Sequence, residues 1–554
     1  MSARPATGTP TAAERYAELT FDRMPSAVPT GLPLDPPQWV RVPGATEWIR
    51  RLPSPASDPL VDWSPAPTEA ALTGAGSPGR SKADAGSPGR GEAGVPLDLP
   101  ALAALLSFGA GVSCAEFGPQ SSWRHHRVAP SARCIFPCSV WIIGWGAEGL
   151  EPDVCRYHPE HQQLRSQDPF KHRRWTRIHC AVTAAPGVTG THYGDYAYRL
   201  VCQEAGLLTG SLLLAARTLG LRARTVPDHR PYDLDQLLCL DGRRECSLAV
   251  IALSGTVTDA VFPAPDVAGP RVRRPCPAFA DLGALSWAAH HEFARTRPRF
   301  RGPAEGGQEH PAAPAALPRQ APVRLPWQRL RAARDSGDPG FVPAPQPVDA
   351  DTLERVCGAA LTTAFPGVWR GLPALSLLSA RRDVPGAECG LFRHDEPTAR
   401  HDEPTARHDE PTARHDEPAT RHDQPAARPG SPPPARQLLT ADAVTPFLRR
   451  CQMVASTNAH QAPATVFVVV DLAAWLRHDA ARAYADLHLR TGEAALRLLM
   501  AASAEGLAAR VHNGFLTGPV REVCGPGRWI APFAVILSRR RPSARYRFVL
   551  EGGL

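Results

Sequence analysis

A helix-sized pattern that occurs twice in this chain of 554 residues constrains its fold more than any other feature. The first copy begins at Tyr193 and reads YGDYAYRLVCQEAGLLTGSLLLAARTLGLRAR, and the second begins at Arg482 and reads RAYADLHLRTGEAALRLLMAASAEGLAAR. The aligned copies match Tyr198 with Tyr484, Gly206 with Gly492, Leu212 with Leu498 and Arg224 with Arg510. Such a match indicates that one unit has been duplicated within the chain.

The segments around the long helix repeat in the same order. In the first half, apolar runs of buried type predict strands at CIFPCSVWIIG, RIHCAVTAAP and SLAVIAL, with a hairpin at LEPDVCRYHPEHQQL. In the second half, FPGVWRGLPALSLLS, GLFRHDEP, ATVFVVVDLAAW and FAVILS occupy the corresponding places. The order of strand, hairpin, strand, long helix, short helix and strand therefore occurs twice, which predicts a duplicated α+β domain.

Linkers rich in Pro, Gly and Arg separate these units. The sequence AGSPGR occurs at Ala75 and again at Ala85, which is typical of flexible low-complexity sequence. The boundaries that we expect are an N-terminal segment over 1–63, a flexible linker over 64–95, a first domain over 96–260, a Pro/Arg-rich linker with a short helix over 261–350, and a second domain over 351–554.

The heptapeptide HDEPTAR begins at His394, His401 and His408 and continues in the variants HDEPATR and HDQPAAR. Regularly spaced His, Asp and Glu could form a metal-binding array. The favoured interpretation is a surface loop over 394–434 that has expanded by repetition, because a Pro in every unit is incompatible with helix and with sheet pairing. We therefore expect no metal site there.

Charge and cysteine content argue against several function classes. The net charge is +8, but the basic residues are almost all Arg and are spread along the chain, which argues against a nucleic-acid-binding surface. The 13 Cys include no Cys-x-x-Cys pair, so a zinc site is not expected. The N-terminus lacks an apolar signal region, and no run of 18 apolar residues occurs. These features predict a cytoplasmic protein with reduced thiols and no membrane span.

Several segments together resemble the SagB-type azoline dehydrogenases of the FMN-dependent nitroreductase superfamily: RVAPSARCIFPCSVWII, LEPDVCRYHPEHQQL, HYGDYAYRLVCQEAG and LLLAARTLGL. The N-terminal YAELTFDRMPSAVPTGLPLDPPQWVRVPGA is similar to the leader segment of these enzymes. The resemblance implies a nitroreductase-like fold, with a mixed, mainly antiparallel sheet flanked by helices. It also implies that the protein uses FMN to oxidise thiazoline or oxazoline rings of a ribosomal peptide to thiazole or oxazole, in a thiopeptide-type pathway. The implied partners are the precursor peptide and a cyclodehydratase.

The resemblance also assigns residues to catalysis and to the cofactor. His192 and Tyr193 stand where the family has a catalytic Lys-Tyr pair. His192 is either a base or a polar loop residue, and Tyr193 is an acid, a base or an orienting group. An FMN phosphate needs a cation, and Arg can offer it two hydrogen bonds at once. The residues expected to contact FMN are Arg127, Ser131, Arg133, Arg199 and Glu204, with Arg90 or Arg80 in place of an early Arg of the family.

The second copy keeps the fold pattern but loses the site residues. Enzymes with the nitroreductase fold are homodimers with FMN at the subunit interface, so the resemblance implies that the second copy is an internal dimer partner and that one FMN site remains. Gly206 is expected to allow close packing against a neighbouring element. Two alternatives stay open: a flavin enzyme that takes electrons from NAD(P)H, and a flavin-free scaffold subunit. The replaced residues are Ser131 by Gly367, Arg133 by Trp369, and Arg199 by Ala485.

Overall fold

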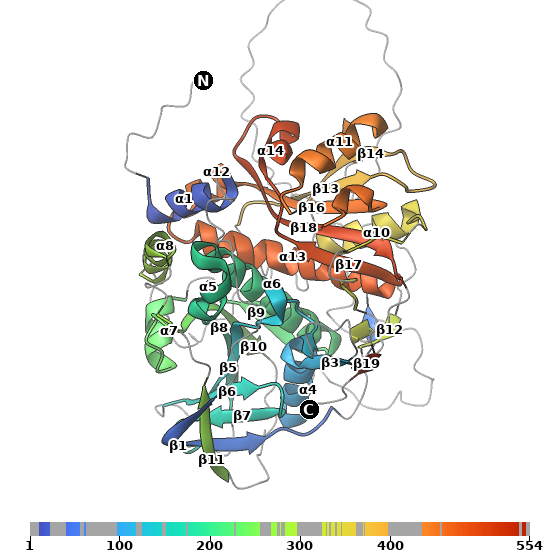
Figure 1. Ribbon diagram of the computed structural model, residues 1–554. Coiled ribbons are helices and arrows are strands. Elements are labelled where there is room, and N and C mark those ends of the chain that lie inside the picture. Colours follow the sequence, from blue (N-terminus) through green and yellow to red (C-terminus); the bar gives the residue numbers. More distant parts are fainter. Residues whose placement is uncertain are drawn as a thin grey trace, which may run out of the picture.

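The computed structural model places two β-sheets on either side of a pair of long helices (Figure 1). The structure describes residues 10–22, 40–55, 60–62, 97–117, 125–146, 151–172, 175–226, 229–254, 267–273, 277–278, 283–295, 324–327, 330–331, 334–337, 341–344, 346–361, 369, 372–396, 435–454, 457–541 and 546–549. The statements below concern these residues.

The first half forms an eight-stranded sheet in the order β11-β1-β7-β6-β5-β8-β10-β9, with every neighbouring pair antiparallel. Its centre is built from the apolar runs that the sequence predicts as strands. The strands are β1 (Val40–Arg51), β5 (Cys138–Trp145), β6 (Asp153–His158), β7 (Gln163–Ser166), β8 (Arg177–Ala184), β9 (Arg222–Thr225), β10 (Cys246–Ser254) and β11 (Val267–Arg273). The helices of this half are α4 (Leu99–Ala110), α5 (Pro186–Tyr193), α6 (Ala197–Thr218) and α7 (Pro231–Leu237).

The second half forms a six-stranded antiparallel sheet in the order β15-β14-β13-β16-β18-β17. This order repeats the segment β7-β6-β5-β8-β10-β9 of the first sheet, strand for strand. The strands are β13 (Ser376–Arg381), β14 (Gly390–Asp395), β15 (Arg436–Leu439), β16 (Ala464–Asp471), β17 (Leu507–His512) and β18 (Trp529–Arg539). The helices are α10 (Ala350–Leu361), α11 (Ala441–Cys451), α12 (Leu472–His478), α13 (Ala483–Ala504) and α14 (Gly518–Cys524). The duplication expected from the sequence is therefore confirmed in the topology.

The two copies of the repeated helix, α6 and α13, pack against each other at the centre of the molecule (Figure 1). They cross at the paired glycines. A Cβ on Gly206 would lie 2.2 Å from the carbonyl oxygen of His488, and a Cβ on Gly492 would lie 2.6 Å from Gly206 Cα. Only glycine permits such an approach of one backbone to another. The expected role of Gly206 in close packing is thus confirmed, and Gly492 shares it.

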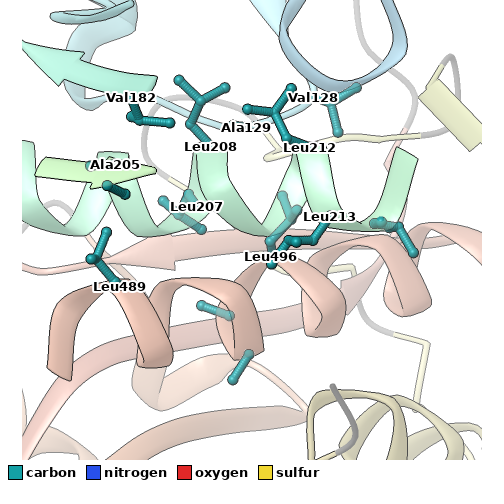
Figure 2. Close-up of a cluster of buried hydrophobic side chains, with 14 of the residues drawn as sticks. Val128, Ala129, Val182, Ala205, Leu207, Leu208, Leu212, Leu213, Leu489 and Leu496 are labelled. Carbon is teal, nitrogen blue, oxygen red and sulfur yellow. The ribbon is translucent and has the colours of Figure 1, made fainter. Parts of the chain in front are cut away.

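Helix α6 is buried on two faces because it lies between α13 and its own sheet. Figure 2 shows Leu207 and Leu213 pointing toward α13, where Leu489 and Leu496 lie. Leu208 and Leu212 point the opposite way, toward Val182 of β8 and toward Val128 (Figure 2). A helix that is apolar on both sides is stable only inside a larger core. The two halves therefore share one hydrophobic core, as the subunits of an obligate dimer do.

The first sheet extends beyond the domain boundaries of 96–260. Strand β1 comes from the N-terminal segment 1–63 and β11 from the linker 261–350, and together they cover the edge of β7. A paired edge no longer presents free backbone groups for association with other chains. Their pairing depends on segments far apart in the sequence, which is why the local pattern did not predict it.

Smaller elements join the two halves. The C-terminal β19 (Tyr546–Val549) pairs with β3 (Val112–Phe117), which also pairs with β4 (His125–Arg127). Strands β2 (Leu60–Asp62) and β12 (Arg324–Pro326) form a separate pair. Helix α8 (Ala284–Ala294) is the short helix expected in the linker, and its Glu292 accepts hydrogen bonds from the first backbone amides of α1 (Ala12–Ala17). A carboxylate at this position stabilises the helix N-terminus.

The heptapeptide expansion falls between two paired strands. Strands β14 and β15 form an antiparallel hairpin, and residues 397–434 connect them outside the described residues. The loop expected over 394–434 thus begins within β14, which ends at Asp395, and its residues from 397 on lie outside the described residues.

Candidate functional site

A strained turn between β4 and β5 carries the Pro-Ser segment singled out in the sequence. Arg133, Cys134 and Phe136 all have left-handed backbones, with φ of 51°, 51° and 50°. Each such residue costs about 1–3 kcal/mol, so the surrounding contacts must hold the turn in place. One contact is internal: Ser131 Oγ accepts a hydrogen bond from the Phe136 amide at 2.8 Å.

Glu204 of α6 fastens the same turn to the central helix. Its Oε1 accepts a hydrogen bond from the Ala132 amide at 2.9 Å, and the side chain is 7% exposed. A hydrogen bond to a charged acceptor is stronger than one between neutral groups, and burial strengthens it further. The expected cofactor residues Ser131 and Glu204 are thus brought together, with Glu204 holding the turn.

Tyr193 ends helix α5 beside this turn. The Arg133 guanidinium lies 5.7 Å from the centre of the Tyr193 ring. Burial raises the pKa of Tyr193 above its usual value, and the charge of Arg133 opposes the rise only in part. The phenol therefore keeps its proton at neutral pH and can donate a hydrogen bond. Gly194, with φ of 53°, then turns the chain into α6.

Residues of the second half also contact this cluster. They do so at the interface between the two halves, which we call the seam. Met453 packs with Ala132 and Tyr193 against Tyr196 and Leu200 of the first half. The Tyr196 hydroxyl donates to the Asn513 carbonyl oxygen at 3.4 Å. A corresponding contact runs from the second half to the first. Arg482, which aligns with Tyr196, donates to the His229 carbonyl oxygen at 3.0 Å. Each long helix thus contacts the loop that follows the edge strand of the other half.

Gln203 lies one helical turn after Arg199 on α6 and faces the same seam. Its Nε2 donates to the Pro532 carbonyl oxygen at 2.6 Å and lies 3.4 Å from Asn513 Oδ1. Its Oε1 is buried and accepts no hydrogen bond from any described residue. An unpaired buried acceptor is costly, so this amide oxygen marks a place where a ligand or a water donor is needed.

Arg199 contacts backbone carbonyl oxygens of two distant segments. It is fully buried, and its Nη1 donates to the Thr20 carbonyl oxygen at 2.6 Å. Its Nη2 faces the carbonyl oxygens of Ala531 and Pro532 at 3.5 and 3.4 Å, and its guanidinium lies 4.0 Å from the centre of the Phe21 ring. The side chain therefore ties the N-terminal segment and β18 of the second half to α6. Our expectation that it holds the FMN phosphate gains no support from these contacts.

The other expected residues are scattered around the turn. Arg127 Nη2 lies 3.3 Å from Glu160 Oε1, and its guanidinium lies 4.6 Å from the centre of the Phe136 ring. His192 is only 1% exposed, so a substrate does not reach its ring in this conformation. Arg90 and the alternative Arg80 lie outside the described residues. The structure thus brings together Ser131, Arg133, Tyr193 and Glu204 and places Arg127 at the edge of the turn, while Arg199 lies 5.3 Å from the centre of the Tyr196 ring.

The corresponding place in the second half is filled by a buried cluster of charged and aromatic side chains. Trp369, which aligns with Arg133, donates from Nε1 to Glu493 Oε2 at 2.5 Å. Arg490, which aligns with Glu204, contacts Glu493 at 3.3 Å and also pairs with Glu396. Glu493 is fully buried, and a Cβ on Gly210 of α6 would lie 2.7 Å from Glu493 Cα. This cluster occupies the symmetry-related position with the chain's own atoms.

The polar groups around the turn have the chemistry that binding of FMN requires. Arg133 and Arg127 are cations, the Tyr193 hydroxyl is a donor, and the Gln203 amide has an unpaired oxygen. Two small cavities lie elsewhere and have free volumes of about 10 and 20 Å³, enough for one water molecule.

Tyr16, Gln203 and Asn513 were missed by sequence reasoning. The Tyr16 hydroxyl donates to the Asp195 carbonyl oxygen at 2.5 Å and accepts from the Arg199 amide at 3.1 Å, which fixes the start of α6. Asn513 precedes Gly514, and an Asn-Gly pair is a turn signal that could have drawn attention to this loop. Among the described residues, no group of three or more His, Cys, Asp or Glu side chains is placed to hold a metal ion. None of the described helices is long and apolar enough to cross a membrane.

Comparison with solved structures establishes the fold. The chain is similar to a putative nitroreductase from Anabaena variabilis, with a TM-score of 0.61 and 16% identity over 96% of this chain and 100% of that one. It also matches a putative nitroreductase from Ralstonia eutropha (TM-score 0.26, 18% identity, 41% of this chain and 100% of that one). A third match is the E. coli microcin synthetase McbBCD complex with truncated pro-MccB17 bound (TM-score 0.23, 19% identity, 33% of this chain and 74% of that one). No protein-family model and no curated protein matches the sequence. The first of these similarities extends over both halves, so the chain has the nitroreductase fold.

Proposed function

We propose that this protein is an FMN-dependent oxidoreductase that converts thiazoline or oxazoline rings of a ribosomally made peptide to thiazoles or oxazoles. The observation that carries the proposal is the cluster of Ser131, Arg133, Tyr193 and Glu204 at the seam of a duplicated nitroreductase fold. The seam is where a homodimer of this fold would hold its cofactor. The cluster occurs once, because its counterpart is filled by Trp369 and charged side chains.

Bound FMN would supply the acceptor for the hydride that leaves an azoline ring when the ring becomes aromatic. Arg133 and Arg127 are the cations that would hold the cofactor phosphate, and Gln203 Oε1 would accept a hydrogen bond from a ring N–H. Tyr193 keeps its proton, so its role is to donate a hydrogen bond and orient the ring, rather than to remove a proton. Glu204 is the carboxylate beside Tyr193 and is the candidate acceptor for the proton that leaves the ring carbon.

The proposal is tested by incubating the full chain with a peptide that contains one thiazoline and following its mass. Loss of two hydrogen atoms, dependent on the protein, is the expected result. Tyr193→Phe should slow the reaction while leaving bound flavin unchanged, because only a hydroxyl is removed. Tyr232→Phe is the matched control, since Tyr232 is 48% exposed and lies on α7. It lies outside the group formed by Ser131, Arg133, Tyr193 and Glu204, which we call the turn cluster. Equal rates in the two variants would remove Tyr193 from the mechanism.

The proposed setting follows from this substrate. The partners would be the precursor peptide and the cyclodehydratase that makes the azoline, and the protein would act in the cytoplasm. A pull-down of the cyclodehydratase from the producing cell with the full chain as bait would test the association.

A second candidate function, a flavin-free scaffold subunit of the same peptide-modifying complex, is favoured by one observation. Arg199, which was expected to hold the cofactor phosphate, is fully buried and donates to the Thr20 carbonyl oxygen. The absorption spectrum of the purified protein separates the two: flavin bands support the dehydrogenase, and their absence after reconstitution with FMN supports the scaffold.

A further inference from the structure

Three side chains next to the turn are arranged as a nucleophile, a base and an orienting carboxylate. Cys134 Sγ lies 3.7 Å from His126 Nδ1, and His126 Nε2 lies 3.3 Å from Glu116 Oε2. These separations place the base within reach of both other groups, in the pattern that defines an activated nucleophile. No step of the proposed oxidation uses the three residues.

The orientation of the imidazole follows from its partners. A carboxylate accepts hydrogen bonds, so His126 carries its ring proton on Nε2, where it faces Glu116. Nδ1 is then the acceptor and faces the Cys134 thiol. Glu116 is 2% exposed on β3, and the paired strand β4 carries His126, so the backbone ladder holds the base and its orienting group together.

Cys134 is held on the strained turn, with φ of 51°, and is half-buried. Left-handed strain at a non-glycine residue is frequent where a side chain must be presented in a fixed direction. Burial raises the pKa of the Cys134 thiol to about 12, and the nearby Arg334 guanidinium opposes the rise. The resting thiol is therefore protonated, so that it becomes a nucleophile only when a base takes its proton.

We propose that Cys134 is the nucleophile of a second active site, with His126 as general base and Glu116 as its orienting group, and that this site attacks acyl carbonyl carbons of esters or thioesters. The Cys134 sulfur forms a bond to the carbonyl carbon while the thiol proton moves to His126 Nδ1. The bond to the leaving group then breaks, and the imidazolium returns the proton to it. Water hydrolyses the resulting thioester. Arg334 is the cation that balances the negative charge on the carbonyl oxygen during the attack.

Cys239 is an internal control for simple exposure. It is exposed and also has a left-handed backbone, with φ of 53°. If strain and exposure alone governed acylation, Cys239 would react faster than the half-buried Cys134. If the general base governs acylation, the rate at Cys134 depends on His126, whereas the rate at Cys239 is independent of His126.

The experiment treats the full chain with p-nitrophenyl acetate and locates the acetyl groups by peptide mass spectrometry. Acetylation of Cys134 should fall by about 100-fold or more in His126→Gln, because a general base contributes at least that factor. Acetylation of Cys239 should be equal in both proteins. Glu116→Gln is the second variant, and it should slow the acetylation of Cys134 without affecting the acetylation of Cys239.

The comparison of the two cysteines provides a readout that a purely structural role would not change, because only the rate of acetylation at Cys134 should depend on His126 and Glu116. Matching urea midpoints for wild type and at least one variant would establish that the fold is intact. Acetylation of Cys239 alone, or of Cys134 at the same rate in wild type and both variants, would overturn the proposal.

Discussion

The glycine crossing at the seam gives the sharpest stability prediction. Gly206→Ala places a Cβ 2.2 Å from a backbone oxygen of α13, whereas ordinary contacts begin near 3.4 Å. The two helices must therefore separate by roughly 1 Å, and a gap of that size removes a quarter to a half of each dispersion contact across the seam. Leu207 and Leu213 of α6 and Leu489 and Leu496 of α13 lie in the affected region (Figure 2).

The expected magnitude follows from two opposing effects. Overpacking costs about 1–3 kcal/mol, and here the upper end applies because backbone cannot rotate away as a side chain can. Alanine in a helix gains about 1 kcal/mol over glycine. Gly206→Ala should thus destabilise the protein by about 2 kcal/mol. Gly358→Ala in α10 is the matched control: its Cβ meets nothing within 4 Å, so the variant should be stabilised by about 1 kcal/mol.

Urea denaturation followed by far-UV circular dichroism measures both variants, and the free energies of unfolding should differ by about 3 kcal/mol. Gly492→Ala should behave like Gly206→Ala. The double variant should lose less than the sum of the two, because the first substitution has already separated the helices. Stabilisation of Gly206→Ala equal to that of Gly358→Ala would refute the close crossing.

Further predictions concern buried polar groups and the inserted repeat. Arg199→Ala should lower the urea midpoint by an amount equivalent to about 3 kcal/mol, because it removes a buried cation that ties three segments together; a selective loss of flavin from an equally stable protein would contradict the structural role. Burial lowers the pKa of His179 to about 4, and its Nδ1 accepts a hydrogen bond from Trp145 at 3.0 Å. Since the unfolded chain binds this proton more readily, the His179 contribution is complete above about pH 6.5 and falls by about 3 kcal/mol toward pH 4. His179→Gln, which retains an acceptor, should flatten a urea-midpoint profile over that range, and an unchanged slope would count against the assignment. Glu493→Gln should destabilise the fold by more than 2 kcal/mol, since it unbalances a buried pair, while flavin per folded chain stays constant. Deleting residues 400–428 should leave the melting temperature and the flavin content unchanged, and a large drop in melting temperature would show that this segment packs on the fold.

Sequence reasoning worked where the relevant pattern is local or repeated. The repeat aligned α6 with α13 and paired Gly206 with Gly492, and the structure brings these two glycines into contact. The strand order of the second sheet follows from the same alignment. Strands β1 and β11 were not anticipated because their pairing partners are distant in the sequence and their own patterns are weak.

The site was harder to predict because it depends on three-dimensional neighbours. Arg199 matched a family position, but its contacts with Thr20 and Pro532 could not be predicted, because no local pattern connects these residues to it. The resemblance named Ser131, Tyr193 and Glu204, which lie around one turn in the structure, and their role at a cofactor stays a prediction. The contact between Cys134 and His126 has no fixed spacing that could have revealed it.

The number of flavins per chain tests the central claim most directly. The full-length protein is reconstituted with excess FMN, freed of unbound cofactor and denatured, and released flavin is measured by absorbance against the protein concentration. A ratio near one per chain is expected, because the turn cluster occurs once and Trp369, Arg490 and Glu493 fill its counterpart. A ratio near two would show that the second half also holds a flavin, and a ratio near zero would contradict the FMN-dependent function.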